Sequence, residues 1–480
     1  MKRHTGEKTY SCTSCDNKFK EEVKEYKKFR NHVNNQIDKE MKRNNGKGIS
    51  EDSPLDEMWR EINIILDPER HSQRAMKLRC DSGIIEEPLK VAQEFNAFFK
   101  KKIVDLAAKI EKDDTFDPLK KLKEKMSKRS EQNGQPLRFT LKTVQVSSVL
   151  KVLKSLKNKK SHGFDQVSAE LLKMTAEIIA EPLTYIINTS ILTGKVPDQW
   201  KKARVSPLLK KGDPTERSNY RPVALLCVAG MVLEKIIGQQ VEEFFETNQL
   251  FGTFQFGFRK QKSTVSELIS LFDQVMEAKD QGKEIALLLY DLSAAFDTVK
   301  GSLLIDKLRI YGFDENALKW MTSYMTGRQQ AVCVNGETSS LINIDIGTPQ
   351  GSRISPLLFC IIMADLSSHI ENSTLSNFAD DTQSLIIANN EQALAETVKK
   401  ESDSVLSFFR GNNLVNNPDK ACLFLNSGGR GKLETIQNIG GENVKSKESE
   451  KLLGVQVSSN LDWNTHIKKL CGSSNRDLDY

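Results

Sequence analysis

Long apolar runs are missing from this 480-residue sequence, and none approaches the roughly 18 residues that a membrane-spanning helix needs. The N-terminal stretch MKRHTGEKTYSC also lacks the apolar core of a signal peptide. Only 8 residues are cysteine, and apart from Cys12 and Cys15 they are scattered along the chain. Scattered cysteines argue against a disulfide framework and for a reducing compartment. These absences predict an intracellular protein with no membrane segment.

Charge is distributed unevenly along the chain. Residues 1–160 hold 37 Lys and Arg against 25 Asp and Glu, whereas the whole chain has a formal net charge of only +6. The basic excess lies in the N-terminal third, where it favours contact with a polyanion such as nucleic acid. A solvated basic face is the alternative explanation. Hydrophobic content of 38% and charged content of 28% are typical of a soluble globular protein, and the length suggests two to four domains.

The first twenty residues form a separate unit. The pattern H-TGEK-x-Y-x-C-x2-C-x3-F resembles the linker and first half of a zinc finger with two cysteine and two histidine ligands. Cys12 and Cys15 are the candidate zinc ligands. His32 falls where the second histidine belongs, but Lys28 occupies the place of the first. Because a structural zinc site needs four ligands, we expect an incomplete, partial finger and a linker over residues 1–45.

Apolar periodicity predicts several helices and strands. Residues 87–112 predict one long amphipathic helix within a helical N-terminal extension over residues 46–135. Further helices are expected over 147–160, 231–246 and 264–278, with a helix pair over 168–193 that Gly194 ends. The continuous apolar run of residues 284–291 predicts a strand that is buried on both faces. The pair Asn335-Gly336 predicts a β-hairpin.

Acidic residues occur at two places where the neighbouring sequence is apolar. Asp291 ends the predicted buried strand, and an acid there is costly unless it is paired or binds a metal. Asp380 and Asp381 interrupt the stretch TLSNFADDTQSLIIA, which predicts a β-hairpin with these two residues at its tip. A solvated turn is the alternative for an isolated Asp-Asp pair. Three convergent carboxylates suit hard cations such as magnesium, and two such ions can activate a hydroxyl and stabilise a pyrophosphate leaving group.

Several motifs occur together in a characteristic order. YDLSAAFD, GTPQGSRISPLLF and FADD resemble the palm motifs of reverse transcriptases of the non-LTR retrotransposon type, the LINE and jockey-like family. KKSHGFDQVSAELLK, VSPLLKKGDPTERSNYRPVALL and QFGFRKQKST resemble its finger motifs, and KLLGVQVSSNLDWNTHI resembles a closing palm motif. The resemblance covers about residues 90–466. It implies an α/β fold of the α+β type, with right-hand polymerase fingers and palm over residues 136–425 and an antiparallel palm sheet. Residues 426–480 would hold the end of the palm and the start of a thumb that is largely missing.

The resemblance also implies roles for individual residues. Asp291 and Asp380 would bind two magnesium ions with help from Asp381, and manganese could substitute. Phe296 would reject ribonucleotides by crowding the sugar 2′ position, and Gln350 would pack against the incoming nucleotide. On pattern alone Phe296 could equally be a core residue, and GTPQGS could be a mere tight turn.

Basic residues would contact phosphates. Lys210, Lys211 and Arg221 would grip the triphosphate, where cations neutralise the charge that builds on the departing pyrophosphate. Arg259, Lys260 and Lys262 would lie along the template backbone, a contact that does not depend on base sequence. Lys420 would protonate the leaving pyrophosphate. A basic surface loop is the alternative explanation for the first group.

Together these features predict an RNA-directed DNA polymerase, a nucleotidyltransferase that uses an RNA template, a DNA primer and deoxynucleoside triphosphates. Two alternatives stay open: a catalytically inactive, retroelement-derived nucleic-acid-binding protein, and a zinc-finger DNA-binding regulator. The retroelement lifestyle favours the nucleus, with the cytoplasm as the other compartment. Departures from the family pattern at the site are small, since Phe378 replaces the commoner Tyr, and Ala294 and Thr348 replace Lys and Val or Ile. The sequence leaves the oligomeric state open.

Overall fold

The computed structural model of the chain describes residues 76–80, 83–110, 116–349, 351–416, 422–425, 435–439, 442–445, 447–461 and 463–476. Residues Met76–His466 form one compact unit, and residues 1–75 and 467–480 belong to a second. Cys12 and Cys15 of the predicted zinc finger, and the predicted site residues Gln350 and Lys420, lie outside the described residues. None of the described helices is both long enough and apolar enough to cross a membrane.

The first of two larger sheets is built around a central strand. Its members are β5 (Glu284–Ser293), β9 (Thr374–Phe378), β10 (Asp381–Ala388), β11 (Val415–Asn416) and β12 (Cys422–Leu425). β10 pairs with one edge of β5, β9 pairs with β10, and β11 and β12 pair with the other edge of β5. Every one of these pairings is antiparallel.

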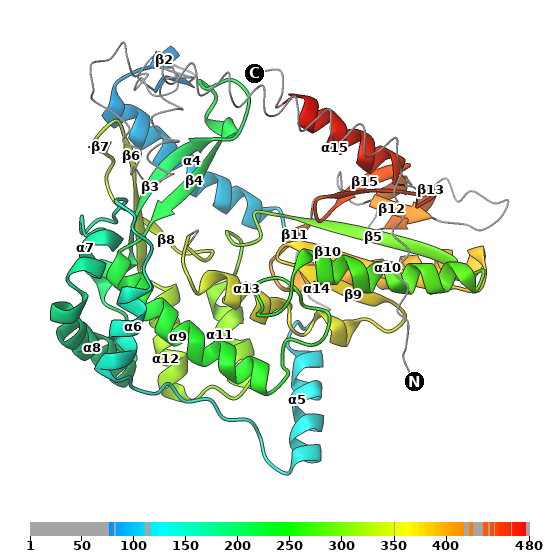
Figure 1. Cartoon of the computed structure of the whole chain (residues 1–480), viewed down its shortest axis with the longest axis horizontal. Helices are drawn as coiled ribbons and strands as arrows, with labels where there is room; N and C mark the ends of the chain where they lie inside the picture. Colours follow the sequence, from blue (N-terminus) through cyan, green and yellow to red (C-terminus); the bar gives the residue numbers. More distant parts are fainter. Residues whose placement is uncertain are drawn as a thin grey trace, which may run out of the picture. The chain divides into compact units, whose positions relative to one another are not determined.

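Two helices cover the two faces of this sheet (Figure 1). Leu288 of β5 belongs to the main core, together with residues of α14 (Glu391–Gly411). Its neighbour Leu287 belongs to a second core cluster with residues of α10 (Thr264–Asp280). Successive side chains of a strand point to opposite faces, so both faces of β5 are covered. The predicted strand, buried on both faces, is therefore confirmed.

The second larger sheet contains one parallel pairing. Its members are β3 (Lys202–Leu209), β4 (Tyr220–Leu225), β6 (Arg328–Val334), β7 (Glu337–Thr338) and β8 (Ile342–Ile344). β3 and β6 run parallel, and the other pairings are antiparallel. α4 (Pro88–Ala108) confirms the long helix predicted for residues 87–112, and its Phe95 shares a core cluster with Val205 and Val332. A small hairpin of β1 (Leu78–Cys80) and β2 (Gly83–Ile85) precedes α4.

A group of helices supplies much of the main core. They are α5 (Lys120–Asn133), α6 (Val146–Lys154), α7 (Ala169–Met174), α8 (Ala176–Thr193), α9 (Val228–Thr247), α11 (Gly301–Ile310), α12 (Glu315–Met325) and α13 (Ser355–Met363). Trp320 of α12 and Phe359 of α13 are fully buried. α8 ends at Gly194 as predicted, because the left-handed φ of 65° at that position suits glycine.

The C-terminal part of the described chain contains two hairpins and a helix. They are β13 (Thr435–Ile439) with β14 (Glu442–Lys445), β15 (Ser449–Leu452) with β16 (Val455–Ser458), and α15 (Asn464–Arg476). Leu452 and Val457 share the second core cluster with Leu287 and Leu271 of α10. The β15–β16 hairpin therefore packs on the same face of the first sheet as α10.

The fold thus mixes helices with mainly antiparallel sheets, in agreement with the predicted α/β class. The hairpin predicted at Asn335-Gly336 joins β6 to β7, and both turn residues have a positive φ. The helices predicted over 231–246 and 264–278 correspond to α9 and α10.

The hairpin tip predicted at Asp380 and Asp381 needs a correction of one residue. Asp381 is the first residue of β10 and pairs with Phe378, so the two turn residues are Ala379 and Asp380. Aspartate favours turns in general, but here Ala379 adopts the positive φ of 60° that closes the two-residue loop. Asp381 is thereby left in the strand ladder.

Candidate functional site

Asp291 and Asp381 lie opposite each other on neighbouring strands. The antiparallel register of β5 and β10 makes the two residues Cα partners. Directly opposed residues in such a ladder share one face of the sheet, with Cα atoms about 4.5–5.5 Å apart. Asp380 lies in the adjoining β9–β10 turn. The structure therefore places two of the predicted carboxylates across from each other and the third beside them.

The turn that carries Asp380 is held by the backbone of the segment QFGFR. Phe256 and Gly257 donate their amide N–H groups to the carbonyl oxygen of Asn377 at 2.8 and 3.2 Å. A Cβ atom on Gly257 would lie 2.2 Å from the amide nitrogen of Ala379, so only glycine permits this approach. The family resemblance places QFGFR in the fingers, but it predicts no role for Gly257.

A second sharp turn follows β5. Ala294 has a φ of 51°, and the Asp297 amide donates to the Ala294 carbonyl oxygen at 2.8 Å. This turn leaves Phe296 half-buried, with its ring centroid 6.2 Å from that of Phe258 and 5.0 Å from that of Phe359. Phe296 is thus packed against two aromatic side chains while part of its surface stays accessible.

The turn that precedes Gln350 contacts the Phe296 turn. Thr348 donates its amide to the carbonyl oxygen of Phe296 at 2.8 Å. Gly347 has a φ of 88°, and a Cβ atom there would lie 2.6 Å from the carbonyl oxygen of Asp297. Gly347 and Thr348 of the GTPQGS motif therefore pack against the turn that follows β5. The role of Gln350 itself stays a prediction.

A buried carboxylate anchors the other side of the same loop. Glu234 of α9 accepts hydrogen bonds from the Tyr324 hydroxyl at 2.9 Å, the Ser352 hydroxyl at 3.0 Å and the Arg353 amide at 2.7 Å. Burial raises the pKa of Glu234 above its ordinary value, although the hydrogen bond from Arg353 acts in the opposite direction. Glu234 was not predicted from the sequence. A single acid inside the apolar helical stretch MVLEKII could have indicated a buried carboxylate.

A cavity of about 110 Å³ opens beside the opposed aspartates. Its lining residues include Asp291, Asp381, Gln383, Lys447 and Lys451. Gln383 is only 1% exposed, and neither of its amide atoms has a partner among the residues that the structure describes. Buried polar groups normally have hydrogen-bond partners, so an amide in this position suits a polar group in the cavity. The sequence analysis missed Gln383 and both lysines, although Gln383 lies two residues after Asp381 on the same face of β10.

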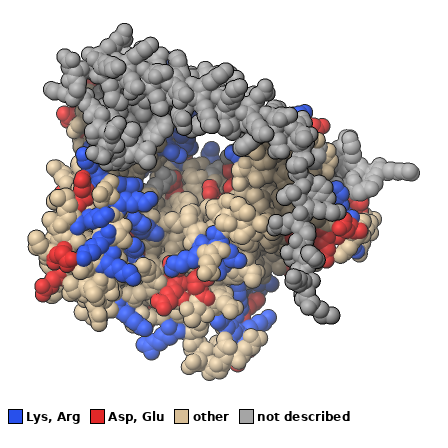
Figure 2. Space-filling model, in the orientation of Figure 1, with Lys and Arg blue, Asp and Glu red and all other residues tan. Residues whose placement is uncertain are grey.

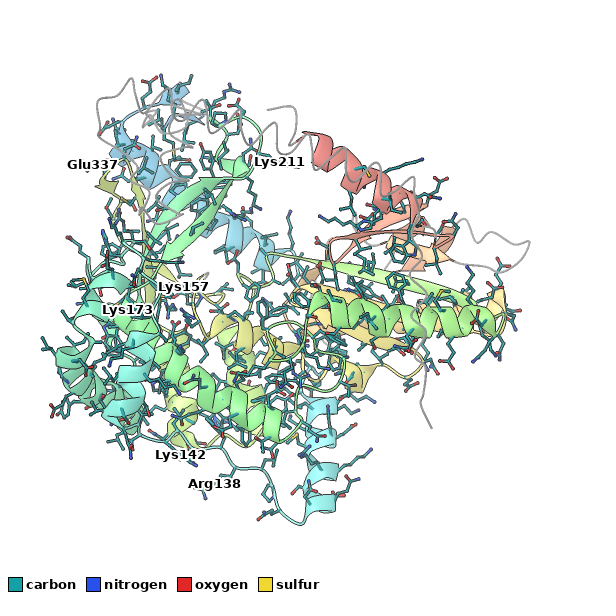
Figure 3. All side chains as sticks on the ribbon, viewed as in Figure 1. Arg138, Lys142, Lys157, Lys173, Lys211 and Glu337 are labelled. Carbon is teal, nitrogen blue, oxygen red and sulfur yellow. The ribbon has the colours of Figure 1, made fainter. Side chains whose placement is uncertain are left out.

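Three of the predicted phosphate-binding residues lie on one hairpin. Lys210 and Lys211 follow β3 in the loop to β4, and Arg221 lies on β4 opposite Leu208 of β3. The Lys210 amide donates to the carbonyl oxygen of Asn219 at 2.9 Å, which closes the base of the loop. All three basic side chains are exposed, and Figure 3 shows Lys211 beyond the end of the β3–β4 ladder.

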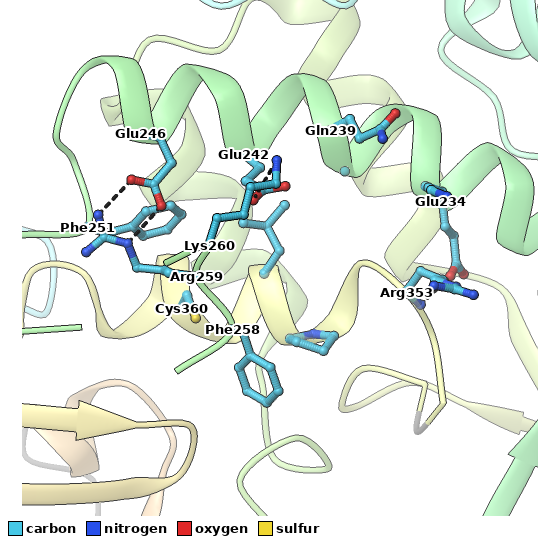
Figure 4. A pocket seen from close by; sticks show the side chains of 14 residues that line it. Glu234, Gln239, Glu242, Glu246, Phe251, Phe258, Arg259, Lys260, Arg353 and Cys360 are labelled. Carbon is cyan, nitrogen blue, oxygen red and sulfur yellow. Dashed lines mark hydrogen bonds and ion pairs between the residues drawn. The ribbon is translucent and has the colours of Figure 1, made fainter. Parts of the chain in front are cut away.

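The three residues predicted to follow the template differ in their surroundings. Arg259 is 14% exposed and forms a bidentate ion pair with Glu246, in which Nε and a terminal nitrogen donate at 2.8 and 2.7 Å (Figure 4). Lys260 is 81% exposed and lies 3.3 Å from Glu242. The Lys262 ammonium lies 4.8 Å from the ring centroid of Phe256. Arg259 is therefore largely committed to contacts inside the protein, whereas Lys260 is accessible.

Arg259 and Lys260 border a groove of about 380 Å³ between α9 and α13 (Figure 4). Glu234 and Arg353 lie at its other end, and Phe258 points away from α9 below α13 in this view. On the face shown in Figure 2, Lys and Arg side chains gather beside a hollow in which acidic side chains are visible.

Glu267 is a buried acid close to the candidate site. It belongs to α10, is fully buried, and accepts a hydrogen bond from the hydroxyl of Ser376 on β9 at 2.5 Å. Burial raises the pKa of Glu267 to about 7, and the negative charge of Asp381 acts in the same direction. In β9 and β10 Ser376 is the register partner of Gln383. A titratable group therefore lies close to the face that carries the opposed aspartates.

The arrangement of the carboxylates bears on whether they can bind a divalent cation. No group of three or more His, Cys, Asp or Glu side chains within the described part of the chain is arranged to hold a metal ion. Magnesium, however, commonly uses one or two protein carboxylates and takes its other ligands from substrate phosphates and water. Asp291 and Asp381, which are Cα partners, could supply one or two such carboxylates, and their role as cation ligands stays a prediction.

The family model described as reverse transcriptase (RNA-dependent DNA polymerase) matches residues 208–457. This match covers more than half of the chain, so the chain belongs to the reverse transcriptase family. The matched region includes Asp291, Phe296, Asp380 and Asp381. The predicted family resemblance is confirmed.

Curated relatives come from retrotransposable elements. The chain is 25% identical over 320 residues to the RNA-directed DNA polymerase from mobile element jockey of Drosophila melanogaster, which covers 65% of this chain and 35% of the relative. It is 31% identical over 229 residues to the probable RNA-directed DNA polymerase from transposon X-element of the same species, and this match covers 47% of this chain and 25% of the relative. It is 25% identical over 248 residues to the retrovirus-related Pol polyprotein from type-1 retrotransposable element R2 of Popillia japonica, and this match covers 49% of this chain and 34% of the relative. The chain thus spans about a quarter to a third of the length of these relatives.

Proposed function

We propose that the chain catalyses RNA-directed DNA synthesis as the polymerase part of a non-LTR retroelement protein. The observation that carries the proposal is the register of β5 and β10, which sets Asp291 opposite Asp381 inside the matched family region. Paired carboxylates are what a nucleotidyl transfer with divalent cations needs. The names of the jockey and X-element relatives as RNA-directed DNA polymerases support the same activity.

In this proposal the first sheet is the palm and the second sheet belongs to the fingers, both within residues 136–425. Residues 1–45 would carry the partial finger and linker, residues 46–135 the helical extension, and residues 426–480 the end of the palm and the start of the thumb. An RNA template, a DNA primer and deoxynucleoside triphosphates are the proposed substrates.

Asp291, Asp380 and Asp381 are the proposed ligands of two magnesium ions, with manganese as a substitute. When bound there, the ions supply a lowered pKa for the primer 3′ hydroxyl and neutralise charge on the pyrophosphate. The surrounding turns orient the substrate, since the positions of Phe296 and Gly347 are fixed by backbone contacts. Phe296 would then exclude a 2′ hydroxyl by occupying its space.

The exposed cations on the β3–β4 hairpin have a separate role in the proposal. Lys210, Lys211 and Arg221 neutralise the triphosphate, which concentrates the substrate and stabilises charge on the leaving group. Exposed side chains at the loop end of this hairpin, where β3 pairs only with β4, can follow the substrate, whereas the aspartates lie on paired strands of the first sheet.

Primer extension on an RNA template tests the proposal. The parent chain should incorporate deoxynucleotides with magnesium, and Asp381→Asn should reduce incorporation by at least about 100-fold, because the charge that holds the cation is lost. Asp306→Asn is the matched control, since Asp306 is exposed on α11 and outside the site. Full incorporation by Asp381→Asn would overturn the assignment. Salt-dependent binding of template and primer without incorporation by the parent would instead support a noncatalytic binding protein.

A further inference from the structure

The most exposed large hydrophobic side chains in the described part of the molecule lie together on α7 and α8. Met174, Ile178, Tyr185 and Leu192 are 79%, 78%, 75% and 69% exposed. Burying large apolar side chains stabilises a protein relative to leaving them in water. Large apolar side chains that remain exposed singly are common, but a contiguous patch marks an interaction surface.

Ile178, Tyr185 and Leu192 form a stripe along one face of α8, with the exposed Glu181 and Thr189 between successive apolar side chains. Ile178, Tyr185 and Leu192 follow one another at intervals of seven residues, which is close to two helical turns. The opposite face of α8 is buried in the main core, where it packs against α6 and α12. Figure 1 shows α8 at the outer edge of this group of helices. The stripe therefore has a fixed backbone and faces outward.

The stripe is self-complementary. Ile178 and Leu192 lie seven residues to either side of Tyr185. In an antiparallel pair of α8 helices with a two-fold axis at Tyr185, Ile178 of one copy packs against Leu192 of the other, and the two Tyr185 rings meet at the axis. A two-fold interface requires this kind of match, because each residue must suit the residue that symmetry places opposite it.

The charges of α8 obey the same symmetry. Glu177 and Glu181 are the only charged residues of the helix, and both lie in its first half. Antiparallel pairing about Tyr185 sets Glu181 opposite the exposed Thr189 and Glu177 opposite the exposed Thr193, so no like charges meet. A parallel pair would set each glutamate against its own copy, which is unfavourable.

The same charges argue against other occupants. Nucleic acid is bound mainly through Lys and Arg contacts to phosphates; α8 contains neither residue, and Lys154 of the neighbouring α6 is already ion-paired with Glu177. A membrane-surface helix is usually rich in Lys and Arg on its polar face, which α8 also lacks. We infer that this face of α8 is a dimer interface with a second copy of this chain, packed antiparallel about Tyr185. This inference does not rest on the polymerase activity.

Sedimentation of the full chain over a range of concentrations tests the inference. The parent should show a concentration-dependent dimer, and Tyr185→Glu should raise the dimer dissociation constant by more than about 100-fold, because it removes the central aromatic anchor. Val104→Glu is the matched control, since Val104 is an exposed apolar residue on α4 at 48% exposure. A parent chain that stays monomeric at every concentration would overturn the inference.

A milder substitution distinguishes the proposed pairing from any other interface. Thr189→Glu sets a negative charge opposite Glu181 of the other copy twice per dimer and should weaken dimerisation about threefold to tenfold. Adding Glu181→Lys to that variant turns both repulsions into attractions and should restore or tighten the dimer. A dimer that neither Tyr185→Glu nor Thr189→Glu weakens, or one that the double variant fails to restore, would exclude antiparallel α8 pairing. Primer extension with the same variants should remain unchanged.

Discussion

Asp291 and Asp381 are direct partners across the antiparallel ladder of β5 and β10. A shift of one residue in this register would move one carboxylate to the other face of the sheet. The relative position of the two acids is therefore set by the apolar residues further along the strands, such as Leu287 and Leu385, which fix the register by their burial in the second core cluster. The two negative charges are held near each other by packing that neither acid supplies.

This arrangement predicts how a divalent cation changes the stability of the protein. Asp291→Asn/Asp381→Asn removes the two negative charges proposed to bind the cation and keeps the size of both side chains. Addition of manganese should raise the melting temperature of the parent and leave that of the double variant unchanged, because only a bound ligand shifts the folding equilibrium. Thermal unfolding with and without the cation measures the shift in both proteins. Equal shifts in parent and variant would exclude these acids as ligands.

Gly257 predicts a sharp dependence on side-chain size. Gly257→Ala would set a Cβ atom 2.2 Å from the Ala379 amide nitrogen, so the Asp380 turn must move or the protein must lose stability. We expect a loss of about 1–3 kcal/mol in the free energy of unfolding, with a fall in primer extension in the folded fraction. Gly238→Ala on α9 is the control, because its Cβ would meet only an Ile354 side-chain carbon at 3.8 Å and alanine favours helix. Equal stability and activity of the two variants would show that the close approach of Gly257 to Ala379 does not hold the Asp380 turn.

Phe296 predicts a change in sugar selectivity. Phe296→Val removes the half-buried ring that contacts Phe258 and Phe359 and replaces it with a smaller side chain. This change should increase ribonucleotide incorporation relative to deoxynucleotide incorporation by about tenfold or more. The measurement is the ratio of kcat/KM for the two nucleotide types in primer extension. Phe258→Leu is a useful comparison, because it removes the neighbouring ring, avoids a β-branched side chain at a position with a φ of 59°, and leaves Phe296 in place. A loss of stability with an unchanged ratio would identify Phe296 as a core residue.

The sequence predicts local features of this fold well. Strand β5 and helices α4, α9 and α10 follow from the spacing of apolar residues, and Gly194 ends α8 because of its own backbone preference. Such signals depend on residues close together in the chain. The family resemblance extends this local evidence to Asp291, Asp380 and Asp381 as a set.

Contacts between distant segments could not be predicted in the same way. The sequence did not reveal that Ala379 belongs to the turn and that Asp381 begins β10, because the turn conformation is fixed partly by Gly257, which is far away in the chain. It also did not reveal that Arg259 pairs with Glu246, since a basic motif has the same pattern whether it faces solvent or an internal acid. Glu234 and Gln383 went unnoticed because burial of a polar side chain is a tertiary property.

Glu267 predicts a pH dependence of stability. Burial raises its pKa from the ordinary value of 4.5 to about 7 in the folded protein, so between these values the folded state retains a proton that the unfolded state has lost. The stabilising contribution of the protonated form is therefore complete below about pH 4.5 and is lost as the pH rises through about 7. Glu267→Gln stays neutral and should be more stable than the parent above pH 7, by on the order of 3 kcal/mol.

Urea unfolding at several pH values measures the Glu267 effect. The difference between Glu267→Gln and the parent should grow from pH 5 to about pH 8, because only the parent must then bury a charge or unfold. Glu243→Gln on the exposed face of α9 controls for the loss of one acid. A difference that does not vary with pH would show that Glu267 remains in one protonation state throughout.

Arg259 and Lys260 are adjacent in the sequence but predict different consequences when they are replaced. Arg259→Met removes the ion pair with Glu246 and the hydrogen bonds to the carbonyl oxygens of Gly252 and Gln255, which leaves partly buried acceptors unsatisfied. We expect it to lower the free energy of unfolding by about 2–4 kcal/mol. Lys260→Met should have little effect on stability, because the Lys260 side chain is 81% exposed and surface ion pairs contribute little.

Template binding as a function of salt separates the two roles. If Lys260 contacts a template phosphate, Lys260→Met should reduce the slope of log affinity against log salt by about 1 and weaken binding equally for all template sequences. Arg259→Met, measured where it remains folded, should change that slope much less, since its guanidinium already has an acidic partner in the protein. A larger change for Arg259→Met than for Lys260→Met would mean that the Glu246 ion pair opens on binding and that Arg259 turns toward the nucleic acid.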